Sequence, residues 1–484
     1  MQHEARRRMS VELLHSLANR ASRWYEQHAL FDDAIEAALT AGDTERASRL
    51  IIHLVENQSF YQITEFYTLS RWLQCLSEET IQRSPTLCQA YALALLFSTE
   101  QHTPALRTRL EHYLRIAEER LRATNNRQKL GEVLALHALA AGQLNDQATS
   151  ISTARQALAL LPADEKDWRS SCLLIIGMQN MLSGRLKEAQ QATRTALTLI
   201  ESSSNSYVIR AAHLTQGMIN LGQGKLHQAA EILRQILDTV GEDRFDRAIT
   251  LTGLAALSYE WNQLTTAEKS AQEAYDISRE LGNELLQVLA TTILARTLYA
   301  QGETAQAQEL LQRLTVHLTQ PQWQREIEIW QRWFASASGD TTPLQQQASA
   351  QQADLADTSE EILTEAQRER EALLLARLLI AQRRIQEALT ILAHWRGQAR
   401  DQLRTRSELE ILLLTARAYF IEHRTQEAQQ VIEEALALAR PVGYLRPFLD
   451  EGEQMAALLK AALPTVREKP LAAFFAETTP RIYT

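Results

Sequence analysis

The chain has 484 residues, a net charge of −9 and only 16 Gly and 10 Pro. That is less than half of the roughly 12% that these two residues make up on average, so the sandwich, barrel and hairpin-rich classes, with a turn about every 8–12 residues, are excluded. With 45% hydrophobic and 23% charged residues, the chain is globular rather than disordered or fibrous. The negative balance argues against direct nucleic-acid binding, because phosphates attract basic surfaces.

The cysteines, the N-terminus and the apolar runs indicate the cellular compartment of the protein. Cys75, Cys88 and Cys172 are odd in number and form no CxxC pair, which favours a reducing environment. The N-terminus carries charges and His where a signal peptide would be apolar, and the richest apolar run, 372–381, is interrupted by Arg377 and far shorter than the about 20 residues of a membrane span. We expect a cytoplasmic protein that does not enter a membrane.

Residues 1–125 are predicted to form an N-terminal helical region. Ala34 and Ala47 lie in helix-turn-helix units, with the turn AGD at 41–43 between them. The stretch RWLQCLSEETIQRSPTLCQAYALALL (71–96) and a helix ending near Arg122 follow.

Residues 126–440 contain an internal repeat. One phrase recurs with a period near 40 residues, as GRLKEA (184–189), GKLHQA (224–229), NQLTTA (262–267), GETAQA (302–307), RRIQEA (383–388) and HRTQEA (423–428). A variant, GQLNDQA, begins at Gly142, and the spacing predicts a worn copy near 340, which makes about eight copies.

Each copy predicts a helix, a short turn and a second helix. A small residue lies about seven positions before the phrase, and the phrase ends on Ala, so two antiparallel helices can approach closely. The small positions are Gly177, Gly217, Ala255, Ala295, Ala376 and Ala416, and the closing alanines are Ala189, Ala229, Ala267, Ala307, Ala388 and Ala428. A lone pair cannot bury its apolar face, whereas stacked pairs share a continuous core.

This pattern resembles tetratricopeptide repeats, whose usual period is about 34 residues. The resemblance implies an all-α fold, a right-handed superhelix of antiparallel helix pairs. Three copies have Asn262, Arg383 or His423 in place of the turn Gly, so they are degenerate.

The two ends carry a narrower resemblance. Residues 441–484 are expected to form a C-terminal helical cap or truncated linker, which includes the phrase GYLRPFLDEGEQMAALL (443–459). Together with the N-terminal region, this phrase resembles the helical segment after the ATPase in ATP-dependent LuxR-family regulators, signal-transduction (STAND-type) ATPases of which the maltose-regulon activator is representative. The matching N-terminal residues are Leu14, His15, Ala21, Trp24, Tyr25, Ala34, Ile35, Ala38, Ala41, Gly42, Asp43, Ala47, Trp72, Leu73, Pro85 and Leu87.

The chain departs from that family in two respects. It has no GxxxxGK[ST] phosphate loop; the nearest sequence is 222–225, where Leu226 stands in place of the Mg²⁺-binding Ser or Thr. About 25 residues follow Leu459, too few for the helix-turn-helix module of the family. We therefore expect an excised fragment, a truncated product or a stand-alone relative.

The search for catalytic groups predicts no enzyme. The 12 histidines form no HExxH, and no CxxC…CxxC or GxSxG pattern occurs, so we expect no catalytic residues, no metal and no cofactor. Asp450 and Glu451 are expected to cap a helix that begins near residue 452.

A binding groove is the stronger expectation. The resemblance implies that the first helix of each pair lines the concave face, where Arg296, Arg377 and Arg417 occupy the same repeat position. With their aromatic and apolar neighbours they suit carboxylates, phosphates or sugars. The predicted ligand- or partner-binding residues are Tyr259, Arg296, Tyr299, Arg377, Arg417 and Phe420. Alternatively, these arginines keep the groove solvated or pair with acids of neighbouring helices. A cluster of Trp323, Trp330, Trp333 and Phe334 is expected to be core rather than a ligand cage.

The resemblance thus implies the ligand-sensing and protein-interaction arm of an ATP-dependent LuxR-type transcription regulator. A small-molecule inducer, peptide or protein would bind in the concave groove, and homo-oligomerisation is left open. The alternative is a stand-alone scaffold that binds a peptide or protein partner.

Overall fold

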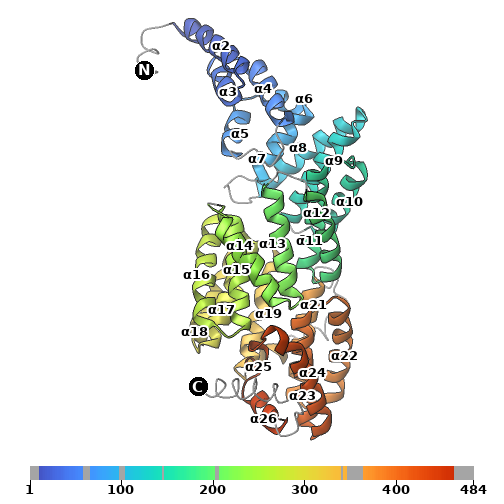
Figure 1. Cartoon of the computed structure of the whole chain (residues 1–484). Helices are drawn as coiled ribbons and strands as arrows, with labels where there is room; N and C mark the ends of the chain where they lie inside the picture. Colours follow the sequence, from blue (N-terminus) through green and yellow to red (C-terminus); the bar gives the residue numbers. More distant parts are fainter. Residues whose placement is uncertain are drawn as a thin grey trace. The chain divides into compact units, whose positions relative to one another are not determined.

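The computed structural model describes residues 10–57, 66–96, 104–143, 146–201, 206–241, 243–339, 342–345 and 364–462. Regular structure in these ranges is helical throughout, which confirms the predicted all-α class (Figure 1). The chain divides into two compact units: unit 1 is Met1–Gln179 with Thr195–Ile209, and unit 2 is Asn180–Arg194 with Arg210–Thr484.

Unit 1 consists of helices of 6 to 20 residues. Its helices are α2 (Val11–Gln27), α3 (Phe31–Thr40), α4 (Thr44–Asn57), α5 (Phe66–Gln74), α6 (Glu78–Arg83), α7 (Pro85–Leu96), α8 (Pro104–Ala123), α9 (Arg127–Gln143) and α10 (Gln147–Leu160). Gly142, expected in a turn, instead lies in the last turn of α9.

Three helices contribute residues to both units, and the remaining helices belong to unit 2. The shared helices are α11 (Lys166–Leu182), α12 (Leu186–Ile200) and α13 (Ser206–Gly222). The helices of unit 2 are α14 (Leu226–Thr239), α15 (Arg244–Glu260), α16 (Leu264–Leu281), α17 (Glu284–Ala300), α18 (Thr304–His317), α19 (Pro321–Ala337), α21 (Glu365–Ala381), α22 (Ile385–Asp401), α23 (Thr405–Ile421), α24 (Thr425–Ala439), η3 (Arg440–Val442), α25 (Arg446–Leu449) and α26 (Gly452–Ala462).

Helices follow one another as packed pairs in unit 2, in the register that the small residues predict. α15 packs on α16, α17 on α18, α21 on α22 and α23 on α24. The closing alanines of the repeat are fully buried, as are the four small-position alanines from Ala255 to Ala416. At Gly217, an added Cβ would lie 3.0 Å from Leu233 Cδ2, so this crossing has no room for a larger side chain. Close helix contact at these positions is therefore what the small residues provide.

The turns that follow α11, α13, α15, α17, α21 and α23 each contain a left-handed residue. Gly184, Gly224 and Gly302 adopt positive φ, and so do the residues that replace glycine, Asn262, Arg383 and His423, at φ of 57–59°. The backbone route of the turn is thus kept where the glycine is lost, at the steric cost that a Cβ brings in this region.

The later repeats of unit 2 pack against the earlier ones at a constant offset. Ala366 N donates to Ser183 O (3.1 Å), Thr405 Oγ1 to Gln223 O (2.7 Å) and Leu445 N to Glu260 O (2.9 Å). In each case the start of a first helix (α21, α23, α25) meets the end of the first helix five pairs earlier (α11, α13, α15). The array therefore curls back on itself, and we call this set of contacts the closure seam.

The closure seam accounts for the glycines at 184 and 224, whereas Gly302 has open space around it. At Gly224, φ is 73° and an added Cβ would lie 2.7 Å from Thr405 Cβ, so the position needs both the left-handed backbone and the space. Asn262 also lies at the seam, and its side-chain oxygen accepts a hydrogen bond from Arg446 Nη1 (3.2 Å). Arg383 and His423 are exposed, so a side chain fits there.

An apolar core runs across the closure seam. Phe448 and Met455 from the C-terminal phrase are buried with Leu233 and Leu257 from the early repeats and Leu412 from α23. α19 lies between α17 and α21 and connects the two halves of the curl (Figure 1).

Several expectations lie outside the described residues. Most of the worn repeat near 340 and the chain after residue 462 are among them. None of the described helices combines the length and the apolar character required to cross a bilayer.

Replacing Arg383 by Gly tests the turn conformation. We expect Arg383→Gly to raise the free energy of unfolding by about 1 kcal/mol, because it relieves a Cβ-bearing residue at φ 59°. Chemical denaturation measures the change. Arg383→Ala keeps the Cβ and should bring no such gain; an equal gain from both variants would contradict the explanation.

Enlarging a closing alanine tests the register of the helix pairs. Ala388 is fully buried, so we expect Ala388→Leu to lower the free energy of unfolding by about 1–3 kcal/mol through overpacking. Thr390→Leu, on the exposed side of the same helix, is the control, and its melting temperature should be close to that of the parent protein. An Ala388→Leu melting temperature equal to that of the parent would refute the register.

Candidate functional site

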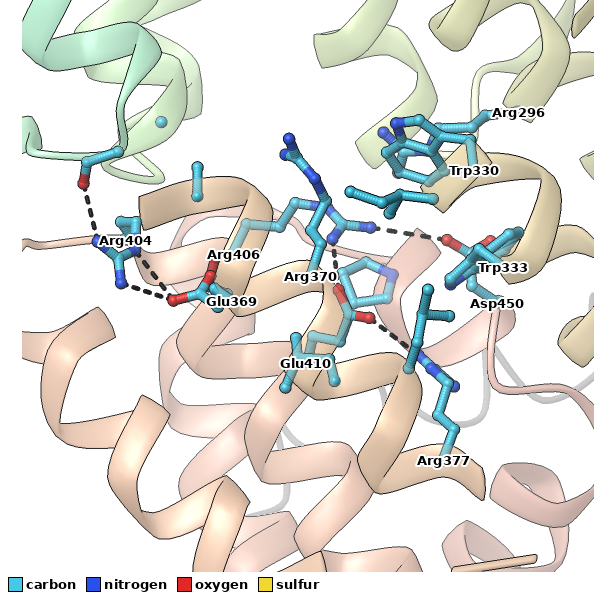
Figure 2. Close-up of a pocket in the computed structure, with 18 of the residues that line it drawn as sticks. Arg296, Trp330, Trp333, Glu369, Arg370, Arg377, Arg404, Arg406, Glu410 and Asp450 are labelled. Carbon is cyan, nitrogen blue, oxygen red and sulfur yellow. Dashed lines mark hydrogen bonds and ion pairs between the residues drawn. The ribbon is translucent and has the colours of Figure 1, made fainter. Parts of the chain in front are cut away.

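Unit 2 contains a cavity of about 270 Å³ on the inner side of the curl (Figure 2). Its wall is drawn almost entirely from first helices of the pairs and from the C-terminal phrase. The residues that line it are Met181, Gly184, Leu186, Gly222, Arg296, Ile329, Trp330, Trp333, Ala366, Glu369, Arg370, Leu373, Leu374, Arg377, Arg404, Arg406, Ser407, Glu410, Pro447, Asp450 and Glu451.

A buried carboxylate, Glu410 of α23, joins two arginines in this wall. Its oxygens accept hydrogen bonds from Arg377 Nη2 (2.9 Å) and from Arg406 Nη1 (2.8 Å), and Arg406 lies one turn earlier on the same helix (Figure 2). Burial acts to raise the pKa of Glu410, but the two guanidinium groups outweigh it and lower the pKa to about 2. The carboxylate is therefore ionised at neutral pH and holds α21 and α23 in a fixed relation.

The C-terminal phrase supplies two further carboxylates. Glu451, with a side chain only 1% exposed, accepts from Arg377 Nη1 (2.8 Å) and Nη2 (2.5 Å). Asp450 accepts from Tyr259 Oη (2.9 Å) and from Arg446 Nε (3.0 Å). The sequence predicts that these two acids cap the next helix; the curl brings their side chains to Arg377 and Tyr259, far away in sequence.

Arg296 of α17 lies against two aromatic rings. Its guanidinium carbon is 4.3 Å from the ring centroid of Tyr259 and 5.0 Å from that of Trp330, distances at which a cation is attracted to a ring face. Its contact to a carboxylate is long, 3.5 Å from Nη2 to Glu260 Oε1, whereas the same oxygen accepts from Arg406 Nε at 2.8 Å. Arg296 is thus held mainly by ring faces.

A second ion-pair group forms the other side of the wall. Arg404, which precedes α23, donates to Glu369 Oε2 (2.6 Å) and to the carbonyl of Gly184 (2.8 Å). Arg370 donates to Glu326 Oε2 (2.6 Å). Arg404 therefore belongs both to the cavity wall and to the closure seam.

The structure brings some of the predicted site residues together at the cavity and leaves others behind its wall. Arg296 and Arg377 line it. Tyr259 is completely buried behind Arg296, and burial followed by the charge of Asp450 raises its pKa to about 12. Arg417 does not line the cavity; its Nη1 lies 3.5 Å from Glu451 Oε2, and Glu451 also pairs with Arg377.

The two remaining predicted residues pack in apolar clusters. The ring of Tyr299 lies tilted against that of Phe334, with the ring centroids 4.8 Å apart, and Phe420 packs against the core that crosses the closure seam. Trp330 and Trp333, expected to be core, are half-buried: they pack on the α17–α19 core and also line the cavity.

Sequence reasoning missed the acids and arginines that complete the network. Arg406, Glu260 and Glu410 sit on first helices among apolar residues, and the four-residue spacing of Arg406 and Glu410 was the available signal. The contact of Glu260 with Arg406 spans 146 residues, and no local pattern predicts it.

The arrangement is chemically suited to binding. Guanidinium groups bind anions and polyhydroxyl groups, and half-buried tryptophans offer flat apolar faces. In the described ranges, no group of three or more His, Cys, Asp and Glu side chains is placed to hold a metal ion.

Helix pairs of this period, with small residues at their crossings, define a tetratricopeptide-type helical-repeat protein. The family described as "MalT-like TPR region" matches residues 131–465, and the chain belongs to it. The chain is 26% identical over 450 residues to the HTH-type transcriptional regulator MalT of Serratia proteamaculans, a match that covers 88% of this chain and 47% of the regulator. The chain thus spans about half the length of the curated relatives it matches.

Solved helical-repeat structures match this chain only with low TM-scores. A chain of the APC/C hetero-tetramer Cut9–Hcn1 has a TM-score of 0.45 and 11% identity, with 100% of this chain and 98% of that chain covered. A Signal Transduction ATPase with Numerous Domains that carries a tetratricopeptide repeat sensor, from Pyrococcus horikoshii, has a TM-score of 0.38 and 12% identity, with 98% and 72% covered.

The lowered pKa of Glu410 predicts an acid-dependent loss of stability. A carboxylate with a folded pKa of about 2 and an unfolded pKa of about 4.3 stabilises the fold above the unfolded value and loses that contribution as the pH falls toward 2. The difference between these two pKa values corresponds to a stabilisation of the fold by about 3 kcal/mol. We expect Glu410→Gln to be less stable than the parent at neutral pH. Its free energy of unfolding should also fall less steeply between these two pH values. Urea denaturation across a pH series measures both effects.

The exposed Glu309 provides the matched control for this titration. Glu309→Gln removes one carboxylate from the outer face of α18, and its stability profile should follow that of the parent protein. A Glu410→Gln profile parallel to the parent at every pH would contradict the assigned role of Glu410.

Proposed function

We propose that this chain is the ligand-sensing and protein-interaction arm of an ATP-dependent LuxR-type transcription regulator. Its membership of the MalT-like TPR region family supports this, and so does its similarity to about half of each of several HTH-type transcriptional regulators. ATP hydrolysis and DNA reading would belong to segments other than these helical repeats.

The cavity of unit 2 carries the proposal. Largely buried arginines and half-buried tryptophans around a partly open cavity are costly for stability, and such convergent polar groups in a concave site are typical of ligand binding. We propose that Arg296 and Arg377 contact a small inducer bearing carboxylate, phosphate or sugar groups, with Trp330 as an apolar face. Tyr259, Tyr299, Arg417 and Phe420 would support this wall from behind.

The C-terminal phrase offers a route from ligand to output. Pro447, Asp450 and Glu451 form part of the wall, so a bound ligand would contact both the repeats and this phrase. A ligand shifts an equilibrium by its difference in affinity for two states. Binding would therefore favour the docked phrase and, through it, an oligomerising, active state of neighbouring domains.

A thermal-shift screen of small carboxylates, phosphates and sugars tests the ligand site. We expect a compound of one of these classes to raise the melting temperature, and Arg296→Ala or Trp330→Ala to weaken its binding roughly tenfold or more through loss of a charged contact or a ring face. The triple change of Arg296, Arg377 and Arg417 to Ala should abolish binding.

Two comparisons make the screen decisive. Arg313→Ala removes an exposed arginine on α18 and should leave the shift unchanged. A ligand bound equally well by the triple variant and the parent removes this cavity from consideration. The genomic surroundings test the regulatory role: an ATPase or helix-turn-helix segment in the same or an adjacent reading frame favours a regulator, and its absence favours a stand-alone scaffold.

A further inference from the structure

The connected cluster of charged side chains at the cavity contains more positive than negative groups. It contains five guanidinium groups, Arg296, Arg377, Arg406, Arg417 and Arg446, and four carboxylates, Glu260, Glu410, Asp450 and Glu451. Of the other arginines of the wall, Arg370 pairs with Glu326, and Arg404 pairs with both Glu365 and Glu369. The connected cluster thus holds one positive charge more than its own four carboxylates neutralise.

Contact lengths locate this surplus charge. Each carboxylate has a short contact to another arginine: Glu260 and Glu410 to Arg406 (both 2.8 Å), and Glu451 to Arg377 (2.5 Å). Asp450 is bonded to Arg446. Two arginines are left with long contacts only, Arg296 and Arg417, each 3.5 Å from a carboxylate oxygen that is already engaged.

Of these two arginines, Arg296 faces the cavity. It belongs to the lining, whereas Arg417 does not. Its side chain is 11% exposed, and no acceptor among the described residues bonds its buried Nε–H. A buried cation without a full counter-charge is unfavourable, and the rings of Tyr259 and Trp330 compensate it only in part.

The guanidinium of Arg296 lies over the ring of Trp330, and Trp333 lies on the same side of the cavity (Figure 2). The lining also includes the apolar side chains of Ile329 and Leu373. A ligand that completes this site therefore needs one negative charge for the guanidinium and a flat or apolar body for the indole faces. A volume of about 270 Å³ limits it to a small molecule.

From this geometry we propose that the cavity binds a small organic monoanion, with a carboxylate on Arg296 and an apolar body against Trp330 and Trp333. This inference rests on the proposed ligand site and narrows its ligand class. An arginine paired with a carboxylate through two parallel N–H donors forms the strongest polar contact that this wall offers. The bound anion supplies the counter-charge that the chain itself lacks here.

Benzoate and benzamide form a matched pair of probes, because they have nearly the same shape and differ by one charge. At constant ionic strength, the full chain should show a saturable benzoate-dependent rise in melting temperature and one binding site by calorimetry. Benzamide should give no shift at the same concentrations. Arg296→Gln should weaken benzoate binding roughly tenfold or more, because it removes a charged hydrogen-bond donor. Arg313→Gln should bind like the parent.

The unliganded variant provides a check that is independent of any probe. Since Arg406 still partners Glu260, Arg296→Gln leaves no acid of the cluster without an arginine. We expect its melting temperature without ligand to equal or exceed that of the parent. A clear drop would identify Arg296 as a structural group and count against the proposal.

The outcomes separate this inference from the proposed function. Equal binding of benzoate and benzamide, lost together in Trp330→Ala, would overturn the anion site and leave the ligand cavity standing. Unchanged benzoate binding by Arg296→Gln, or no benzoate-dependent shift at all, would also overturn the anion site. Failure of the whole carboxylate, phosphate and sugar screen would overturn the proposed function itself.

Discussion

The closure seam is the constraint on which the rest of unit 2 depends. Helix pairs that stack only on their neighbours would leave their inner faces open, and charged side chains there would be solvated. Because α21, α23 and α25 meet the ends of α11, α13 and α15, that inner face becomes a wall. The arginines and acids of the wall are consequently removed from water and must find partners within the chain.

The buried network follows from this enclosure. Glu410 bridges Arg377 and Arg406 and thereby connects α21 with α23, while Glu451 and Asp450 connect the C-terminal phrase with α21 and α15. Buried ion pairs of this kind add little net stability compared with apolar packing, but they penalise any arrangement that separates them. The network therefore specifies how the C-terminal phrase docks.

The candidate site was only partly predictable. Arg296 and Arg377 could be named because they recur at one position of the repeat, and the repeat places that position on the inner face. Their partners could not: Glu260 and Glu451 belong to segments that approach them only through the curl, across 146 residues in the contact of Glu260 with Arg406. Trp330 and Trp333 show a related limit, since helical spacing identifies an apolar stripe without telling which of its residues border a cavity.

The sequence by itself determined the all-α class, the period of the helix pairs and the crossings of small residues, because these depend on contacts within about 40 residues. It also determined the turns, since even the exposed Arg383 retains the left-handed backbone that glycine adopts elsewhere. Only the tertiary structure decided that Gly224 faces Thr405, that Asp450 and Glu451 pair with a tyrosine and arginines, and that Arg296 lacks a full counter-charge. The reason is physical: the offset of five helix pairs accumulates from small rotations at every crossing, and no single repeat encodes it.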